Sequence, residues 1–363
     1  MYIESLALSS FRNYDQIEVS FSPGINILYG DNAQGKTNIL EAIYLCATTK
    51  SHRGSRDREM IMFGREEAHI KALYSDGDSG HRIDIHLRRG KTKGAALDLI
   101  PVKRSGELIG NIHAVCFSPE DLDIIKAGPS ARRRFIDLEM CQLDKVYLHD
   151  ISAYNRVINQ RNELLKQIYR DPALDATLDV WDAQLVTYGK SVIKARKKFV
   201  RELSEKLAPV HEWLSGGRET LELKYAPDTP AEELEERLFS RRDTDKKLKM
   251  STAGPHRDDL IFNINGSDVR VFGSQGQQRT AALSLKLSEL ELVREHTGSM
   301  PVLLLDDVLS ELDRNRQKYL MELIRQTQTI VTCTGMEEFI TNSVAADKIY
   351  KVAAGQLTET GGN

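Results

Sequence analysis

The sequence predicts an α/β protein in which two strand-rich segments bracket a long α-helical insertion. Three observations support this fold class. A glycine-rich loop at residues 30–37 stands between a strand pattern and a helix pattern. Residues 301–313 contain an apolar run, typical of a central buried strand, that ends in two aspartates. Between these two motifs, residues 120–213 carry helical periodicity and almost no strand signal.

The N-terminal segment has the pattern of a strand-rich α/β lobe. Short apolar-rich runs separated by turn residues predict strands at residues 2–8, 16–21 and 25–29. A helix is expected at about residues 36–46, because Ile39, Leu40 and Ile43 fall on one face. Further strands are expected at residues 69–74, 82–87, 95–100 and 112–117.

The insertion has the pattern of a helical hairpin. Apolar residues recur at alternating spacings of four and three from Leu143 to Ile168, and nearly repeat that pattern from Leu185 to Val210. Two long antiparallel helices are therefore expected, with a break near Asp171 and Pro172. A projecting arm and a compact bundle both satisfy this pattern, with the arm somewhat favoured.

Strand character returns in the C-terminal segment. Asn265 and Gly266 predict a hairpin turn between strands at residues 260–264 and 269–272. A helix at about residues 276–295 and a strand at 302–305 should follow, then a helix at 315–325 and a strand at 329–332. We therefore expect an N-terminal lobe at residues 1–125, a helical arm domain at 126–250 and a C-terminal lobe at 251–363.

Composition limits the class of protein. The chain has 363 residues, of which 40% are hydrophobic and 28% charged, so dominant disorder is not expected. No apolar run approaches the roughly 18 residues of a membrane helix, and the N-terminus lacks the pattern of a signal peptide. The four cysteines are far apart, which fits a reducing cytoplasm. Because the net charge is −3, a polyanion would have to bind to local basic patches.

Residues 30–37, GDNAQGKT, match the phosphate-loop pattern G-x-x-x-x-G-K-[ST] in full. Gly30 and Gly35 allow backbone amides to close around phosphate oxygens. Lys36 would reach the β- and γ-phosphates of ATP, and the Thr37 hydroxyl would ligate Mg²⁺. A chance match is the plain alternative, which the flanking strand and helix disfavour. The rest of the cradle would be Asp31, Asn32, Ala33 and Gln34.

Residues 301–313, PVLLLDDVLSELD, supply the second motif. Asp306 ends the predicted strand and would support Mg²⁺, while Asp307 would polarise the attacking water. Alone, this stretch would fit equally well an ordinary strand followed by a capped helix. With a phosphate loop upstream, the pair indicates a nucleoside triphosphatase with a large insertion in one ATPase domain.

A third element lies at residues 272–280, FGSQGQQRT. It resembles the signature motif of ABC-type ATPases, usually LSGGQ, although a helix with an N-terminal serine cap would explain it too. In that family the signature of one protomer caps the γ-phosphate bound by the other. The resemblance implies that Ser274 to Arg279 act across a homodimer, with nucleotide contacts from Ser274, Gln275, Gly276, Gln277 and Gln278.

The chain as a whole resembles the bacterial RecF family, a member of the ABC/SMC group of ATPases. The matching blocks are SSFRNY (9–14), GDNAQGKTN (30–38), SHRGSRDREMI (51–61), FSPEDL (117–122), RRRFID (132–137), GPHRDDL (254–260), SQGQQR (274–279) and LLLDDVLSELD (303–313). The resemblance implies an ATPase head of two lobes with an inserted helical arm.

The resemblance also implies a function. RecF proteins bind gapped DNA, cooperate with RecO and RecR, and help to load RecA in DNA repair, the SOS response and replication restart. For this chain it implies a weak, DNA-dependent ATPase with Arg12 and Asn13 near the nucleotide and a D-loop at residues 310–313. The turn at residues 118–120 would occupy the place of the Q-loop, although no glutamine stands there.

Two departures from the transporter pattern suggest slow hydrolysis. Asp307 replaces the usual glutamate, and the strand at residues 329–334 ends without the switch histidine. ATP binding is therefore expected to act mainly as a clamp, with hydrolysis as the release step.

Basic clusters are the candidate DNA contacts, although a charge run is often only a solvated face. The candidates are Arg53 and Arg56, next to His52 and Arg58, and a hairpin tip with Arg88, Arg89, Lys91 and Lys93. A third cluster, Lys194, Arg196, Lys197, Lys198 and Arg201, is more consistent with a solvated helix face. Aromatic residues are not interleaved, so backbone contact is favoured over base stacking.

Three rival functions are weaker. The ATPase subunit of a membrane transporter would usually carry LSGGQ and a switch histidine. An SMC-type DNA tether would need a far longer coiled coil. A nucleoside kinase would leave the signature and the D-loop without a role. In the segment GPHRDDL, residues 254–260, the charged residues could join the nucleotide site or form a local ion-pair cluster, and the cluster is slightly favoured.

Overall fold

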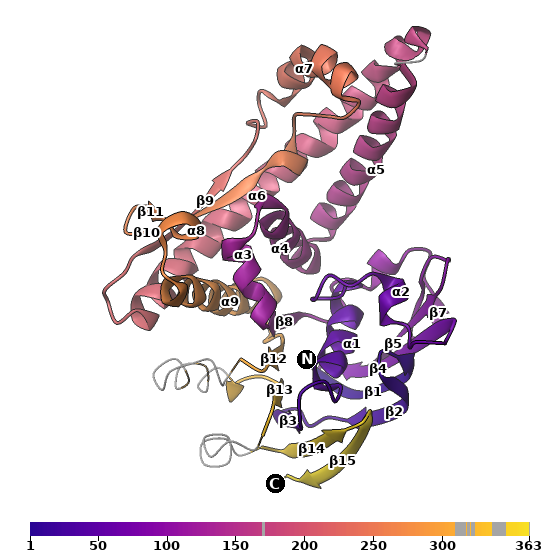
Figure 1. Ribbon diagram of the computed structural model, residues 1–363, viewed down its shortest axis with the longest axis vertical. Helices are drawn as coiled ribbons and strands as arrows, with labels where there is room; N and C mark the ends of the chain where they lie inside the picture. The colour runs from indigo at the N-terminus through magenta and orange to yellow at the C-terminus, as the bar shows by residue number, and fades with distance from the viewer. Residues whose placement is uncertain (169–170, 309–316, 318–319, 321–323, 336–345, 363) are drawn as a thin grey trace. The chain divides into compact units, whose positions relative to one another are not determined.

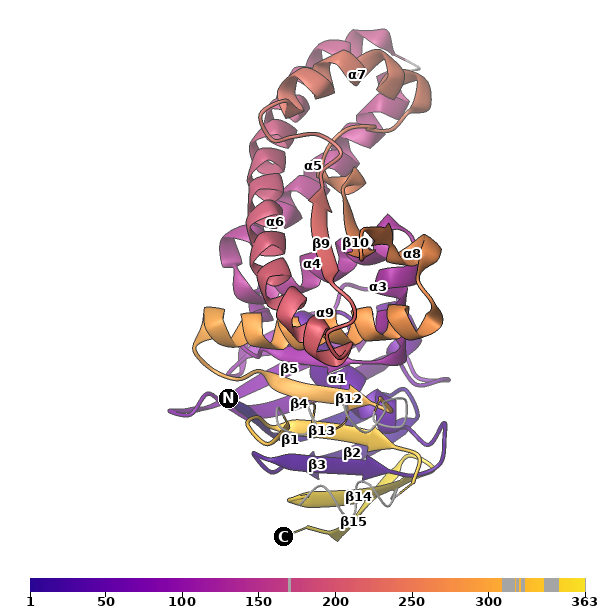
Figure 2. The same cartoon turned by 90° about the vertical axis from the view of Figure 1, so that its left-hand side faces the viewer.

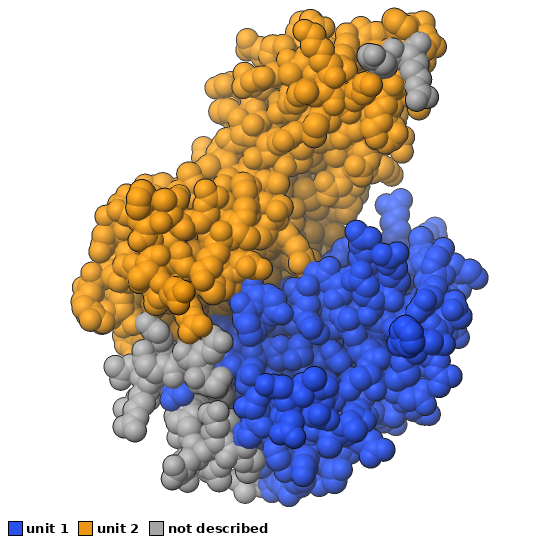
Figure 3. All heavy atoms as spheres, in the orientation of Figure 1, with its two compact units in different colours: residues 1–121, 289–363 blue, residues 122–288 orange. Residues whose placement is uncertain are grey.

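The computed structural model describes residues 1–168, 171–308, 317, 320, 324–335 and 346–362. The chain forms two compact units (Figure 3): residues 1–121 with 289–363, called unit 1, and residues 122–288, called unit 2. The expected boundary at residue 125 lies close to the first division. Residues 251–288, which we assigned to the C-terminal lobe, instead belong to the same compact unit as the helical insertion.

Unit 1 contains two six-stranded sheets (Figures 1 and 2). The antiparallel sheet has the order β2-β1-β4-β5-β6-β7. Its strands are β1 (Tyr2–Phe11), β2 (Tyr14–Ser20), β4 (Glu67–Ser75), β5 (Gly80–Arg88), β6 (Gly94–Leu97) and β7 (Ile100–Pro101).

The second sheet of unit 1 has the order β15-β14-β3-β13-β12-β8. Its strands are β3 (Ile25–Tyr29), β8 (Ala114–Phe117), β12 (Val302–Asp306), β13 (Thr329–Cys333), β14 (Lys348–Ala353) and β15 (Gln356–Gly361). All neighbours are parallel except β14 and β15. Strands β3, β13 and β12 are neighbours and run parallel. The segments that follow β3 and β12 therefore leave the sheet at the same end, the carboxyl end of the strands.

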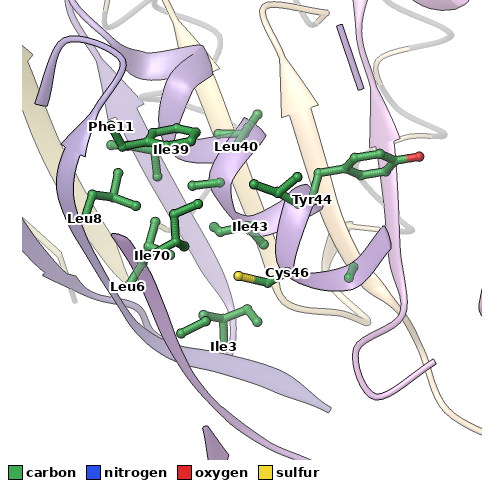
Figure 4. Close-up of a cluster of buried hydrophobic side chains, with 14 of the residues drawn as sticks. Ile3, Leu6, Leu8, Phe11, Ile39, Leu40, Ile43, Tyr44, Cys46 and Ile70 are labelled. Carbon is green, nitrogen blue, oxygen red and sulfur yellow. The ribbon is translucent and has the colours of Figure 1, made fainter. Parts of the chain in front are cut away.

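Helix α1 (Lys36–Thr48) packs between the two sheets (Figure 4). Ile39, Leu40 and Ile43 join one apolar cluster with Leu6 of β1 and Ile330 of β13. A helix buried on nearly all sides is held by packing rather than by its intrinsic propensity. The core therefore fixes the helix that carries the glycine-rich loop at its N-terminus. Short helical segments complete the unit: α2 (Asp57–Met60), η1 (Ser105–Leu108) and η2 (Pro119–Asp121).

Unit 2 is built on a helical hairpin. Helices α5 (Lys145–Ile168) and α6 (Leu178–Leu214) pack along each other and are joined through η3 (Pro172–Thr177), so the predicted antiparallel pair is confirmed. At about 1.5 Å per residue, the 37-residue α6 is about 55 Å long. The remaining elements are α3 (Leu122–Lys126), α4 (Pro129–Leu143), β9 (Leu221–Ala226), α7 (Leu234–Leu248), η4 (Pro255–Arg257), β10 (Asp259–Ile264), β11 (Ser267–Asp268), α8 (Val269–Phe272) and the first part of α9 (Gln275–Thr297), whose residues from Glu289 onward belong to unit 1.

Two strand predictions are wrong, and several elements were not predicted. Residues 95–100 are not one strand but the antiparallel β6–β7 pair, because Asp98 and Leu99 turn the chain with φ values of 50° and 67°. Residues 269–272 form α8, not a strand, because the Asp268 carboxylate accepts a hydrogen bond from the Arg270 amide and starts a helix. The Asn265–Gly266 turn is confirmed, but β11 pairs over only two residues. The sequence analysis did not predict β9, α7, β14 or β15. Most of the helix expected at residues 315–325 falls outside the described residues.

In the described part of the chain, no helix is both long enough and apolar enough to cross a membrane.

A buried charge network fixes the far end of the hairpin in unit 2. Arg161 of α5 is fully buried and donates to Asp182 of α6 at 2.6 Å and to Asp245 of α7 at 2.7 Å. Asp245 also accepts from the amide and hydroxyl of Thr252. Removing one partner of such a pair leaves a buried charge without compensation, which is far costlier than losing a surface pair.

We therefore predict that Asp245→Ala destabilises unit 2 by about 3–5 kcal/mol. The matched control is Asp243→Ala, whose side chain is 92% exposed and should change stability by less than about 0.5 kcal/mol. Both tryptophans, Trp181 and Trp213, lie on α6, so urea unfolding followed by tryptophan fluorescence reports on this unit. Equal midpoints for the two variants would contradict the assignment of a structural role to the network.

Candidate nucleotide-binding site

The glycine-rich loop connects β3 to α1, as predicted. Gly35 has φ +118°, and a Cβ there would lie 2.6 Å from the side-chain nitrogen Nδ2 of Asn13 and 2.7 Å from the Tyr14 hydroxyl. A Cβ on Gly30 would lie 2.2 Å from the carbonyl oxygen of Val352. Both positions therefore require glycine, because neighbouring atoms fill the space that a side chain would take.

The Lys36 amino group lies inside the loop. It donates to the carbonyl oxygens of Gly30 and of Asp31, the latter at 2.9 Å, and the residue is only 6% exposed. Asp31, Asn32 and Ala33 are exposed at the open side of the loop. The loop thus presents an ammonium group at the N-terminus of a buried helix, an arrangement that attracts phosphate.

The two sequence motifs meet in unit 1. The Thr37 hydroxyl donates to Oδ1 of Asp306 at 2.8 Å, although the residues are 269 positions apart. Asp306 is 5% exposed at the end of β12, and Asp307 follows with φ 55°. Thr332, which the sequence analysis did not single out, donates to the same Asp306 oxygen at 2.7 Å.

These donors fit Mg²⁺ bound together with a nucleotide. Mg²⁺ is usually held by one or two carboxylates, hydroxyls and substrate phosphates rather than by a cage of protein ligands. Thr37 and Asp306 provide such a pair of oxygen ligands at the phosphate loop. Consistent with this, the described residues contain no cluster of three or more His, Cys, Asp or Glu side chains suited to a metal. When bound there, Mg²⁺ would neutralise charge on the phosphates.

Two hairpin turns hold the loop at Gln34. The side chain of Asn13, in the β1–β2 turn, donates to the Gln34 carbonyl oxygen at 2.8 Å. In the β14–β15 turn, the Ala354 amide donates to the Gln34 side chain at 2.6 Å. A Cβ on Gly355 would lie 2.7 Å from the Asn13 carbonyl oxygen, so the two turns are also packed closely together. The predicted position of Asn13 beside the loop agrees with this geometry.

Arg12, the other residue expected near the nucleotide, contacts α1 and the segment that follows it. Its guanidinium donates to both carboxylate oxygens of Glu41, at 2.6 and 2.7 Å, and to Ser55 and the Glu59 carbonyl oxygen. Glu41 is fully buried and also accepts from Ser51. Burial alone would raise the pKa of Glu41, but the hydrogen bonds from Arg12 and Ser51 and the Arg12 charge lower it overall.

His52 lies close to Glu41 of α1, and Arg53 lies close to Asn38 of the same helix. Burial lowers the pKa of His52, while the negative charges of Asp306, Glu41 and Glu120 oppose that shift. His52 therefore adds no positive charge to the predicted basic cluster at neutral pH. The Arg53 guanidinium lies 3.5 Å from the Asn38 side chain of α1 and 3.9 Å from Glu120. Ser118 and Glu120, expected in the place of the Q-loop, lie at the end of β8 and in η2.

The signature segment begins α9 as a capped helix. The Ser274 hydroxyl accepts from the Gln277 amide at 3.2 Å, and the Gln277 side chain accepts from the Ser274 amide at 2.8 Å. Ser274, Gln275, Gly276 and Arg279 are exposed, whereas Gln278 is buried and donates to the Val269 carbonyl oxygen. Ser274 therefore caps the helix and is exposed at the same time. The exposed residues of the segment remain accessible to a second molecule.

The candidate DNA contacts differ in their surroundings. Arg89 and Lys91 are exposed at the β5–β6 turn, Arg53 and Arg56 are exposed after α1, and Arg88 is half-buried. Lys93 instead donates to the Thr49 carbonyl oxygen and to Asp57, at 2.8 and 2.9 Å, and burial lowers its pKa. Lys93 is therefore not among the proposed DNA contacts.

Charged residues of unit 2 form a separate local network. Arg196 is 1% exposed and pairs with Asp137 at 2.7 Å and Asp258 at 3.0 Å, so it does not present its charge to DNA. Arg132 pairs with Asp259, and the Tyr154 hydroxyl hydrogen-bonds with Nδ1 of His256. Burial lowers the pKa of His256 to about 4. The charged residues at 256–259 are thus structural within unit 2, as favoured above.

Several residues of the site were missed from sequence. Thr332, Glu41 and the 354–355 turn reach the site through strand pairing or helix packing, which no local pattern encodes. A weak signal did exist for Thr332, because it is a polar residue near the end of an apolar strand. The expected D-loop at residues 310–313 lies outside the described residues.

The fold and the site define a class. A parallel sheet whose central strands carry a phosphate loop and an aspartate pair, with a signature-like helix start in the same chain, is typical of an ABC/SMC-type ATPase head.

Comparisons with known proteins narrow the class. Residues 2–359 match the family described as RecF/RecN/SMC N terminal domain. The chain is 56% identical to the DNA replication and repair protein RecF of Agathobacter rectalis, over 98% of this chain and 99% of that protein. It is 58% identical to the protein of that name from Lachnoclostridium phytofermentans, with the same coverage. The chain therefore belongs to the RecF/RecN/SMC family and, within it, to the RecF proteins.

Solved structures agree with this family membership. The structure of the recombination mediator protein RecF-ATP in the RecFOR pathway has a TM-score of 0.93 and 36% sequence identity, covering 99% of this chain and 98% of that one. The Smc head domain of Pyrococcus furiosus, with a TM-score of 0.57 and 17% identity over 99% of this chain and 96% of that one, shares the fold. The RecF resemblance and the ABC/SMC head fold predicted from sequence are confirmed.

The depressed pKa of Glu41 gives a pH-dependent prediction. A carboxyl with a lowered pKa in the folded state stabilises the fold above the ordinary glutamate value, and this contribution is lost as the pH falls through the folded pKa. We expect Glu41→Gln to cost about 1.5–3 kcal/mol near pH 7, because charge-assisted hydrogen bonds are removed. The cost should begin to shrink below about pH 4.3, where Glu41 of the unfolded chain takes up a proton, and should disappear only below the lower pKa of the folded state.

Urea unfolding followed by circular dichroism, at about pH 7 and about pH 3, measures this difference. The matched control is Glu66→Gln, an exposed glutamate of unit 1, which should have little effect at either pH. A Glu41→Gln cost that does not depend on pH would rule out the ionised pair with Arg12.

Proposed function

We propose that the chain is an ATP-dependent, DNA-binding recombination mediator. ATP binding would drive homodimerisation and binding to gapped DNA or single-strand/double-strand junctions. With RecO and RecR, the complex would promote RecA loading in DNA repair and replication restart. The observation that carries the proposal is the Thr37–Asp306 hydrogen bond, which assembles a phosphate-loop ATPase site in a chain 56–58% identical to RecF proteins.

The exposed signature supports the dimer. In an isologous pair, the surface that one protomer presents to its partner is the same surface that it receives. Ser274 and Gly276 would therefore contact the γ-phosphate bound in the partner, and two ATP molecules would lie at the seam. The N-terminus of the 23-residue α9 would add favourable potential for an anion. Gln275 and Gln277 would complete this contact, whereas Gln278 is buried against Val269 and is left out of it.

Hydrolysis is proposed as the release step. Lys36 would stabilise the transferring phosphoryl group, and Asp307 would orient the attacking water. The carboxylate of Asp307 is one methylene shorter than the glutamate usual in transporters, so a weak, DNA-stimulated ATPase is expected. ATP with Mg²⁺, bound through Thr37 and Asp306, would be the cofactor of this cycle. We place the protein in the cytoplasm, where its DNA substrate is accessible.

The ATP clamp can be tested with two site variants. ATP and Mg²⁺, but not ADP, should dimerise the wild-type chain and tighten its binding to a gapped duplex. Lys36→Arg should abolish both effects by weakening phosphate binding, and Ser274→Arg should abolish both by blocking the seam while leaving ATP binding intact. Analytical ultracentrifugation and fluorescence anisotropy on the same samples measure the two effects.

Ser240→Arg is the matched control for the second variant. It places the same bulk and charge on the exposed surface of α7, away from the signature segment, and should behave as wild type. The clamp is refuted when ATP binds to the wild-type chain and neither its oligomeric state nor its DNA affinity changes.

Exposed basic residues of unit 1 are the proposed DNA contacts. We expect the double variant Arg89→Glu, Lys91→Glu to weaken duplex binding and to lower the slope of log affinity against log salt by about 0.9 for each phosphate that is no longer neutralised. Arg53→Glu and Arg56→Glu should act in the same direction, and Arg88→Glu less, since Arg88 is half-buried. Lys351→Glu, an exposed lysine of β14, is the control for net charge. An unchanged salt slope in all basic variants would place DNA elsewhere.

A further inference from the structure

We propose that Thr332 is a positioning residue that holds both aspartates of the ATPase site, and thereby sets the affinity of the site for Mg²⁺. The inference deepens the proposed function, because it rests on ATP binding with Mg²⁺ at Thr37 and Asp306. It does not depend on dimerisation, DNA or any partner protein.

The hydroxyl of Thr332 is shared between the two aspartates. It lies 2.7 Å from Oδ1 of Asp306 and 3.0 Å from the backbone nitrogen of Asp307. The Asp307 N–H donates, so the Thr332 oxygen accepts there and its own proton goes to the Asp306 carboxylate. Thr332 is 1% exposed, and its hydroxyl therefore forms these bonds in a site screened from water.

Strand register places Thr332 where it can do this. In the parallel ladder Thr332 lies opposite Asp306 of β12 on one side and Leu28 of β3 on the other. Just beyond this level the chain leaves the sheet, into the phosphate loop after β3 and through Asp307 after β12. A hydroxyl at this register of the middle strand therefore lies beside the ends of both motif-bearing strands.

Two features of the aspartates involve that hydroxyl. Oδ1 of Asp306 accepts hydrogen bonds from two hydroxyl groups, those of Thr37 and Thr332. Asp307 adopts φ 55°, a left-handed conformation that is unfavourable for a residue with a side chain. Its amide is held in this conformation by the Thr332 hydroxyl and, at 3.3 Å, by the Thr332 carbonyl oxygen.

The hydroxyl would act on the metal through Asp306 without contacting it. Residues that orient a metal ligand in this way commonly change metal affinity by about 10–100-fold when they are removed. Thr332→Val keeps the branched shape of the side chain and deletes only the hydroxyl. Thr332→Ser keeps the hydroxyl and deletes only the methyl group.

The test measures binding of a fluorescent ATP analogue to the full chain as Mg²⁺ is titrated, and repeats the binding in EDTA. We expect Thr332→Val to raise the Mg²⁺ concentration at half-saturation by at least about tenfold, with binding in EDTA changed less than about twofold and Thr332→Ser close to wild type. ATP turnover at saturating Mg²⁺ should also fall in Thr332→Val, because the amide of Asp307 loses the hydroxyl that restrains it.

Thr329→Val is the matched control. Thr329 is a fully buried threonine at the start of the same strand, and its hydroxyl lies 3.3 Å from the Thr327 carbonyl oxygen, away from both aspartates. This variant should leave the Mg²⁺ titration unchanged. Circular dichroism and thermal melting of all three variants separate a folding defect from a change at the site.

The outcomes distinguish the two proposals. A wild-type chain that binds nucleotide without any response to Mg²⁺ refutes the proposed ATP switch and this inference together. A normal wild-type response with an unchanged Thr332→Val titration refutes the inference alone. The inference is also overturned when Thr332→Ser is as impaired as Thr332→Val, or when Thr329→Val shifts the titration equally, because the hydroxyl at 332 would then have no specific role.

Discussion

The hydrogen bond between Thr37 and Asp306 joins residues 269 positions apart and brings the two sequence motifs together. Neither residue can form a site alone, because a hydroxyl at a helix start and a carboxylate at a strand end are common features. The bond can form because β3 and β12 are parallel and only β13 lies between them. Both motifs therefore leave the sheet at the carboxyl end of the strands, close together. The order of three strands is thus the constraint from which the nucleotide site follows.

The second requirement is a phosphate loop that holds its shape, and both ends of the chain provide it. The β1–β2 turn contacts Gln34 through Asn13, and the β14–β15 turn contacts it through Ala354. The ion pair between Arg12 and the fully buried Glu41 fixes the same helix. Since neighbouring atoms fill the space beside Gly30 and Gly35, the loop is preorganised by packing, and little conformational entropy remains to be lost when phosphate binds.

How far the sequence predicts this protein depends on the range of each interaction. Lys36, Thr37 and Asp306 were predicted, because a glycine pattern and an apolar run ending in aspartate are local signals. Thr332 and the β14–β15 turn were not, because their roles arise from pairing between distant strands. Charge alone also misled: Lys93 was predicted to contact DNA and Arg196 to lie on a solvated helix face, but they are paired with Asp57 and Asp258. A single capping aspartate made α8 a short helix where a strand was expected.

The same geometry bears on why binding and hydrolysis can be separate steps in this chain. The phosphate loop is held by the core around α1 and by two turns, and Asp306 ends a fully buried strand. Asp307 is different, because its backbone conformation is unfavourable and its amide is held by hydrogen bonds to one residue of the neighbouring strand. Its side chain is also shorter than the glutamate usual in transporters. A site that is rigid where it binds phosphate, and strained where it would orient water, favours tight binding over fast turnover, which is the property that an ATP-driven clamp requires.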